Sequence, residues 1–191
     1  MIKIFFLIFF LFIFIINHNA FANEKKLIIE NLIKTKTLKF NFEQITNKKK
    51  ETGECLLYFD KKFKCTYGEN KKKELVINDS RLAIVQKRYN KIYYYPIKKS
   101  ILLKILDKDQ LIKLINFSKI EKDDQQIRLT YINNDEKEIV ILFDKASYNL
   151  KGWIINDQFD NIIIFKINNL LKNEKINLSE FVIPKLTRPQ N

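Results

Sequence analysis

The sequence predicts a mainly β protein of the α+β class, with a single curled antiparallel sheet and helices that can cover its concave face. Three observations support this prediction. Segments of alternating apolar and polar residues recur at short intervals, turn-forming Asn and Asp residues separate them, and few segments have helical periodicity. Short strands joined by tight turns pair with their neighbours in antiparallel fashion. A twisted sheet of about ten strands tends to curl and to enclose a concave apolar face.

The first helix is expected near the start of the folded part. Apolar residues recur there at helical spacing, at Ile28, Ile29, Leu32 and Ile33, with lysines opposite. A second, apolar helix is expected from Ser100, its cap, to Asp107. The segment over residues 109–115 fits a helix or a strand equally well, because periodicity does not separate the two. Both apolar segments could cover the concave face of the sheet.

The strands are predicted from period-two alternation, which is clearest where Leu38, Phe40 and Phe42 share one face. Further strands are expected at Gly53–Phe59, Lys62–Tyr67, Glu74–Ile77, Arg81–Gln86, Lys91–Tyr95, Ile127–Ile132, Glu138–Phe143, Leu150–Ile155, Asn161–Ile167 and Phe181–Ile183. Turn residues lie between most of them.

The first 22 residues are predicted to be a signal peptide. Lys3 precedes an unbroken apolar run over residues 4–16, and Ala20-Phe21-Ala22 provides a small-x-small cleavage pattern. The run spans roughly 20 Å as a helix, less than the ~30 Å hydrocarbon core of a bilayer. The alternative is an uncleaved anchor. We expect the chain to be exported and cleaved after Ala22, leaving a single domain over residues 23–191.

Composition argues against most enzyme classes. The chain has 191 residues, of which 46% are hydrophobic, enough for one domain with a core. Its only histidine, His18, lies in the predicted signal peptide, and its three glycines are scattered. Without histidine there is no Ser-His-Asp or Cys-His mechanism and no His-ligated metal site. We therefore expect no enzyme activity, no metal and no cofactor.

The chain is basic, with 35 Lys+Arg against 22 Asp+Glu. Such a charge can indicate nucleic acid or anionic lipid as a partner. The lysine clusters, however, fall at predicted turns, where solvation explains them. We expect no nucleic-acid partner and a monomer.

Cys55 and Cys65 lie on consecutive predicted strands. A three-residue turn near residues 59–61 would place them opposite each other, within bridging distance. The alternative is a pair of reduced, buried thiols.

Six short segments occur in a recognisable order: Phe40-Asn-Phe42-Glu-Gln44, Gly53-Glu-Cys-Leu-Leu-Tyr58, Val76-Ile-Asn-Asp79, Lys91-Ile-Tyr-Tyr-Tyr-Pro96, Leu150-Lys-Gly-Trp153 and Phe181-Val-Ile-Pro184. In these segments and their order, the chain resembles the LolA-type family of periplasmic outer-membrane lipoprotein carriers over roughly residues 26–184. The resemblance implies a periplasmic location and a half-open β-barrel covered by a helical lid, with an apolar cavity for the acyl chains of lipoproteins. It also implies loading by an inner-membrane ABC transporter and delivery to an outer-membrane receptor.

Twelve residues are candidates for binding acyl chains: Phe40, Phe42, Leu57, Phe59, Phe63, Tyr67, Ile84, Tyr93, Tyr95, Leu102, Leu106 and Trp153. The same residues fit an ordinary core that is permanently filled by side chains. The chain departs from the family at Phe59, where many members have an Arg that bonds to the lid helix. Phe59 donates no hydrogen bond. Lys61 or Lys62 could substitute for the Arg, although the register argues against it. We therefore expect the lid to close by apolar contact.

Other functions remain open from the sequence. A carrier of another amphiphile, such as a glycolipid, fits the same fold, and so does a sensor of stray lipid. An outer-membrane receptor of similar fold would need an acylated Cys after the signal, where Asn23 stands instead.

Overall fold

The computed structural model describes residues 23–59, 61–68, 72–79, 81–96, 101–133, 137–156 and 160–185. The predicted signal peptide and the predicted cap Ser100 lie outside the described residues. None of the helices in the described ranges has the length and apolar character needed to cross a bilayer.

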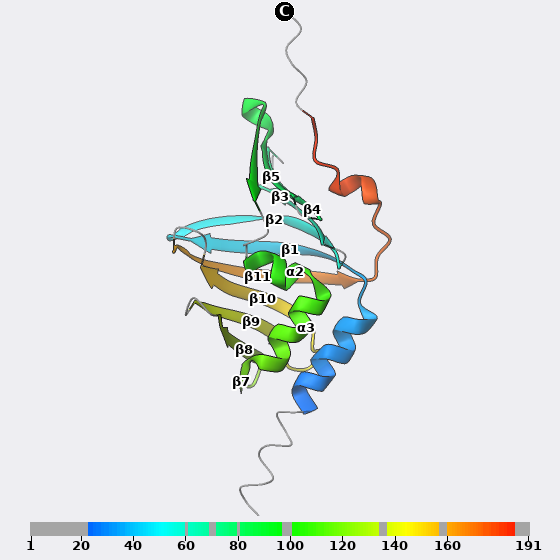
Figure 1. The fold of residues 1–191 in the computed structure, drawn as a ribbon, viewed down its shortest axis with the longest axis vertical. Coiled ribbons are helices and arrows are strands. Elements are labelled where there is room, and N and C mark those ends of the chain that lie inside the picture. The colour runs from blue at the N-terminus through cyan, green and yellow to red at the C-terminus, as the bar shows by residue number, and fades with distance from the viewer. Residues whose placement is uncertain are drawn as a thin grey trace, which may run out of the picture.

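Eleven strands form one open antiparallel sheet in the order β6-β5-β4-β3-β2-β1-β11-β10-β9-β8-β7, which confirms the predicted fold class (Figure 1). The strands are β1 (Thr37–Thr46), β2 (Lys49–Tyr58), β3 (Lys62–Tyr67), β4 (Lys73–Asn78), β5 (Arg81–Gln86), β6 (Lys91–Pro96), β7 (Lys119–Lys122), β8 (Gln126–Ile132), β9 (Glu138–Asp144), β10 (Leu150–Asn156) and β11 (Ile162–Lys172). The first and last long strands, β1 and β11, pair at the centre and join the two halves of the sheet.

The pairing register sorts side chains onto two faces. Phe40 lies opposite Cys55, which lies opposite Cys65, and the row continues through Leu75 on β4 and Ile84 on β5. Directly opposite residues share a face of the sheet. This face is the concave one, and its central part forms the main hydrophobic core.

Three helices cover part of the concave face (Figure 1): the N-terminal helix (residues 23–34), α2 (Ile101–Leu106) and α3 (Lys108–Phe117). The segment that fitted helix or strand equally is therefore helical. Asp107 begins α3 by accepting hydrogen bonds from the backbone N–H groups of Asp109 and Gln110, which is typical of an N-cap. Leu111, Leu114 and Ile115 of α3 are buried.

Two predictions at the ends of the sheet were wrong or incomplete. Residues 181–183 do not form a strand: a 3-10 helix, η2 (Leu178–Phe181), ends there. The Asn177 side chain caps it by accepting from the N–H of Ser179, and a buried Phe181 anchors it. Strand β7 was not predicted. Its sequence Lys-Ile-Glu-Lys has a single apolar residue, too few to show alternation.

A second, smaller apolar cluster lies on the convex face. Val76, Ala83 and Val85 are buried although they face away from the main core. Helix η2 packs on β3 and β4 from this side and places Phe181 there with no exposed area. The C-terminal segment thus covers the outer face of β3 and β4, and the main core lies beneath the helices.

Candidate functional site

The covered part of the concave face is lined by an aromatic stack. The Trp153 ring is parallel to the Phe165 ring at 4.2 Å between centroids, and Phe165 stacks on Phe42 at 5.0 Å. The Tyr67 and Phe42 rings form a T-shaped pair with 4.9 Å between their centroids. Trp153 is only 2% exposed. Such a stack gives broad apolar contact with few polar groups to satisfy.

Glycine makes room for this stack at one strand position. Gly53 lies directly opposite Phe42 in the β1–β2 pairing. A Cβ atom at residue 53 would come within 2.8 Å of the Phe42 ring and would clash with the Thr66 carbonyl. The glycine therefore allows the Phe42 ring to lie across the neighbouring strand.

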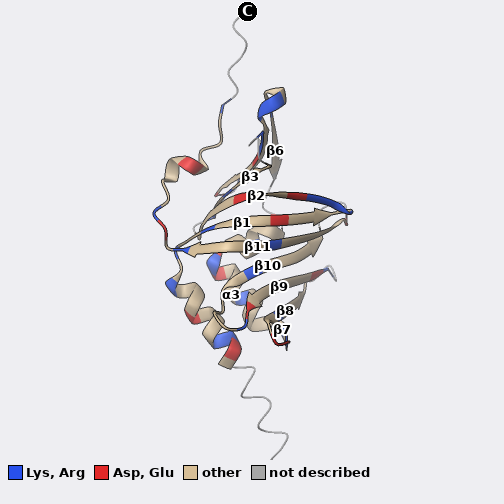
Figure 2. Ribbon diagram, turned by 180° about the vertical axis from the view of Figure 1, so that it is seen from behind, with Lys and Arg blue, Asp and Glu red and all other residues tan. Residues whose placement is uncertain are grey.

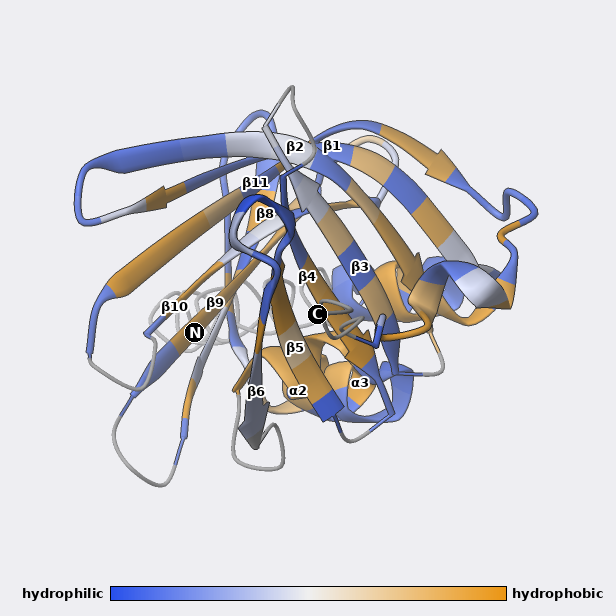
Figure 3. Cartoon of the chain, turned by 90° about the horizontal axis from the view of Figure 1, so that it is seen from above, coloured by the Kyte–Doolittle hydropathy of each residue, from blue (hydrophilic) through white to orange (hydrophobic). Residues whose placement is uncertain are grey.

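The other part of the concave face, on β5 and β6, is less covered. Ile84 is half-buried. Tyr93 lies opposite Ile84 and Tyr95 lies opposite Leu82, and both tyrosine side chains are exposed. Apolar residues mark β4 and β5 on this side and also helices α2 and α3 (Figure 3). The sheet therefore has a closed apolar half and a partly open one.

Helix α2 is packed less tightly than α3. Its residues Ile101, Leu102 and Leu103 are half-buried and touch the core from its edge, whereas Ile105 and Leu106 are fully buried. Only the C-terminal end of α2 is thus firmly seated. The N-terminal end packs against the edge of the core and stays partly exposed.

Lysines fasten the helices at their ends. Lys61, in the β2–β3 turn, pairs with Asp107 at the junction of α2 and α3, with 3.1 Å between Nζ and Oδ2. This corrects the expectation that apolar contact alone closes the lid. The sequence register had argued against Lys61, but residue 61 lies in the β2–β3 turn with a positive φ, and its side chain reaches the lid from there.

Two further lysines donate to carbonyl groups at helix ends. Lys108 donates to the Thr35 carbonyl at 2.6 Å, and its ammonium group lies 5.4 Å from the Phe59 ring centroid. Lys25 donates to the Ser118 carbonyl at 2.6 Å, beyond the end of α3. Burial lowers the pKa of both ammonium groups. Cations satisfy carbonyls left without partners at helix C-termini, so these contacts hold α3 and the N-terminal helix side by side.

The predicted acyl-chain residues divide into three groups by burial. Fully buried in the core are Phe40, Phe42, Leu57, Phe63, Tyr67, Leu106 and Trp153. Half-buried are Phe59, Ile84 and Leu102. Tyr93 and Tyr95 are exposed at 41% and 39%. All twelve lie on the concave face or on the elements that border it.

Sequence reasoning missed several residues of the covered face. Phe165 is the centre of the aromatic stack, and Ile141, Phe143 and Leu111 are completely buried in the same core. Alternation on β9 and β11 was visible in the sequence. What was not visible is that β11 returns to pair with β1, which places Phe165 beside Phe42.

Cys55 and Cys65 form a disulfide between directly opposite residues of β2 and β3. Both residues are buried, at 0% and 1% exposure. The bridge lies on the concave face, in the same row as Phe40. It fixes the hairpin whose turn carries Lys61.

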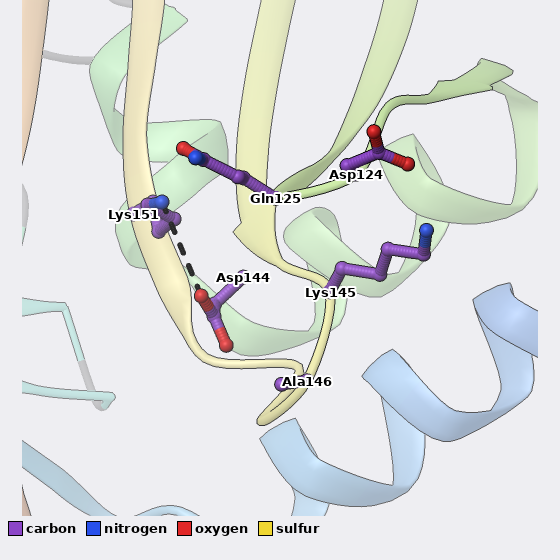
Figure 4. A pocket seen from close by; sticks show the side chains of 6 residues that line it. All are labelled: Asp124, Gln125, Asp144, Lys145, Ala146 and Lys151. Atoms are coloured by element: carbon purple, nitrogen blue, oxygen red, sulfur yellow. Dashed lines mark ion pairs between the residues drawn. The ribbon is translucent and has the colours of Figure 1, made fainter.

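Two surface hollows are lined mostly by polar residue types. The first, of about 530 Å³, is lined by Asp124, Gln125, Asp144, Lys145, Ala146 and Lys151 (Figure 4). Its carboxylate Asp144 accepts hydrogen bonds from the Oγ and N–H of Ser147, which lower the pKa of Asp144. The Asp144 carboxylate therefore stabilises the turn that follows β9. The second hollow, of about 490 Å³, is bordered by Phe42 and by polar residues that include Asn41, Glu43 and Thr52.

A curved sheet with an apolar concave face beneath a cover of short helices defines a class of carrier for apolar groups. The chain belongs to one family of this class, the outer membrane lipoprotein carrier protein LolA, whose family model matches residues 33–184. The chain is also similar to an outer-membrane lipoprotein carrier protein of Campylobacter jejuni. The two are 29% identical over 166 residues, 81% of this chain and 83% of the relative.

Solved structures support the fold. An uncharacterized conserved protein from Thermus thermophilus matches with a TM-score of 0.54 at 8% identity, over 86% of this chain and 94% of that chain. A chain of the Pseudomonas aeruginosa MucA/MucB complex matches with a TM-score of 0.50 at 11% identity, over 86% of this chain. This chain covers only 61% of the length of that neighbour. At these identities the likeness concerns the fold alone.

Proposed function

We propose that this protein is a periplasmic carrier that shields the acyl chains of lipoproteins and moves them from the inner to the outer membrane. The observation that carries the proposal is the concave face: it is apolar from β5 to β8 and is covered in part by short helices instead of a second sheet. Membership of the lipoprotein carrier family supports lipoprotein as the cargo.

The size of the hydrophobic effect explains why such a carrier is needed. Each buried methylene contributes about 0.8 kcal/mol, so a chain of ~16 carbons favours an apolar site by roughly 12 kcal/mol. A lipoprotein therefore leaves a membrane only if an apolar site of comparable affinity receives it. Side chains such as Phe42, Phe165 and Trp153 provide contact of this kind without directional bonds.

The acyl chains must displace part of the lid, because the covered part of the concave face is filled by its own side chains. We propose that they insert between α2 and the open half of the sheet. The half-buried Leu102 on α2 and the exposed Tyr93 and Tyr95 on β6 form the mouth of this path. Movement of α2 would then extend the site toward Phe40 and Trp153.

The remaining parts of the proposal come from the sequence and the family. We propose that residues 1–22 direct export and are removed after Ala22, leaving one domain over residues 23–191. An inner-membrane ABC transporter would load the protein, and an outer-membrane receptor would accept the cargo. The pairing of Lys61 with Asp107 would hold the lid closed on the way.

The test is to express the full sequence in a Gram-negative host, release the periplasmic contents, and identify bound material by mass spectrometry. We expect the protein to begin at Asn23 and to carry triacylated polypeptide. Purified protein should also take up a synthetic triacylated lipopeptide, with a change in the emission of the buried Trp153. Recovery of free glycolipid alone, with no lipopeptide uptake, would favour a carrier of another amphiphile.

A further inference from the structure

The β5–β6 hairpin projects from the body of the protein and is basic and rich in tyrosine. It comprises β5, the 3-10 helix η1 (Lys87–Tyr89) and β6, and in Figure 1 it extends beyond the helices that cover the sheet. Residues 81–96 contain four basic residues and no acidic residue. Figure 2 shows basic residues at its tip. The core does not require this composition, because no residue of η1 is buried.

Charge and aromatic groups lie together at the tip. The Arg88 guanidinium carbon lies 5.7 Å from the centroid of the Tyr89 ring, which is 61% exposed. Lys91 is exposed at the start of β6. Lys87 is engaged differently, since its Nζ donates to the buried Glu74 at 2.7 Å. The charges available to a partner are therefore those of Arg88 and Lys91, with the exposed Lys72 beside them.

Strand β6 carries tyrosines on both of its faces. Tyr93 and Tyr95 share the concave face with Ile84 and Leu82, whereas Tyr94 lies opposite Ala83 on the convex face and is 63% exposed. A protein partner would cover one face of such a strand. A membrane interface surrounds a projecting hairpin, and tyrosine is enriched there because its ring is apolar and its hydroxyl is polar.

From this arrangement we propose that the β5–β6 hairpin is a docking site for anionic phospholipid surfaces. Arg88 and Lys91 contact lipid phosphates, and Tyr89 and the β6 tyrosines lie at headgroup level. The docked hairpin places the open half of the concave face next to the bilayer. The interaction itself requires no cargo, so it stands or falls independently of lipoprotein transport.

Vesicle binding by the protein expressed from its full sequence tests this proposal. Vesicles of phosphatidylcholine alone are compared with vesicles that also contain phosphatidylglycerol. Apolar contacts contribute equally to binding of both, so the difference in binding measures the electrostatic contribution. We expect partitioning at least about tenfold stronger onto the anionic vesicles at low salt. Raising the salt to about 1 M shortens the Debye length to ~3 Å and should abolish that preference.

Matched variants locate the site. The double variant Arg88→Glu/Lys91→Glu should lose the preference for anionic vesicles, and Tyr89→Ser should weaken binding even if the double variant folds poorly. The control Lys113→Glu/Lys175→Glu makes the same charge change at exposed positions elsewhere and should bind within about twofold of the parent. Unchanged Trp153 emission and thermal melting show that the fold is intact. Equal losses in both double variants, or no anionic preference in the parent, would overturn the proposal.

Discussion

The ammonium group of Lys61 lies 3.1 Å from the carboxylate of Asp107, and this ion pair joins the β2–β3 turn to the junction of α2 and α3. Asp107 also caps α3 through the N–H groups of Asp109 and Gln110. The contact is half exposed on the lysine side, so its strength is that of a surface pair, at most about 1 kcal/mol. A contact of this strength can bias a lid without locking it.

Lys61→Ala should therefore open the lid more often while changing overall stability little. We expect the free energy of unfolding to fall by less than about 1 kcal/mol and the uptake of triacylated lipopeptide to become faster. Asp107→Asn should behave alike, because an amide oxygen still caps α3 but the charge is lost. Stopped-flow Trp153 fluorescence measures the uptake rate.

Asp107→Ala separates the two roles of this residue. Loss of the cap should cost about 1 kcal/mol beyond the loss of the ion pair, visible in urea denaturation. Uptake rates of Lys61→Ala and Asp107→Asn equal to that of the parent would show that the pair does not control the lid.

Leu102→Asp should lower lipopeptide uptake about tenfold or more, because a carboxylate at the mouth must be desolvated by an incoming acyl chain. Leu102 is only half-buried, so the fold should survive. The control is Phe117→Asp, on a side chain that is 79% exposed at the end of α3, where uptake should stay within about twofold. Phe42 does not suit this test. Its ring is buried between Tyr67 and Phe165, so replacing it by Asp would destabilise the core.

Replacing Cys55 and Cys65 together by serine should lower the free energy of unfolding by about 3 kcal/mol, the loop-closure value for a separation of ten residues. Urea denaturation of parent and variant gives the difference. Thiol alkylation followed by mass spectrometry should label the parent only after denaturation and reduction, because both residues are buried. Prompt labelling of two thiols in the native parent would contradict this.

Tyr67 should make the protein sensitive to alkali. Burial, and secondarily the nearby charge of Glu51, raises the pKa of its phenol above the ordinary value of 10.0. Below pH 10 the phenol is protonated in both states and its contribution to stability is complete. Above pH 10 the unfolded chain loses the proton first, so stability falls as pH rises toward the folded-state pKa.

Tyr67→Phe should remove this part of the alkaline loss. It should also cost about 1 kcal/mol at neutral pH, because the phenol donates a hydrogen bond to Gln44 at 3.0 Å. Denaturation curves between about pH 8 and 12 measure both effects. The control Tyr94→Phe, on an exposed ring, should leave the pH profile unchanged. A parallel decline in Tyr67→Phe and the parent would show that Tyr67 is not responsible.

The sequence by itself determined which residues could share a face. Alternation at Phe40 and Phe42, and helical spacing at Ile28 and Leu32, follow from the local geometry of the backbone, so the fold class was predictable. The tertiary structure decided which part of the concave face is covered. It also decided that Phe165 completes the aromatic stack and that Phe181 anchors a 3-10 helix on the convex face instead of forming a strand. These outcomes depend on how distant segments meet, which local periodicity does not encode.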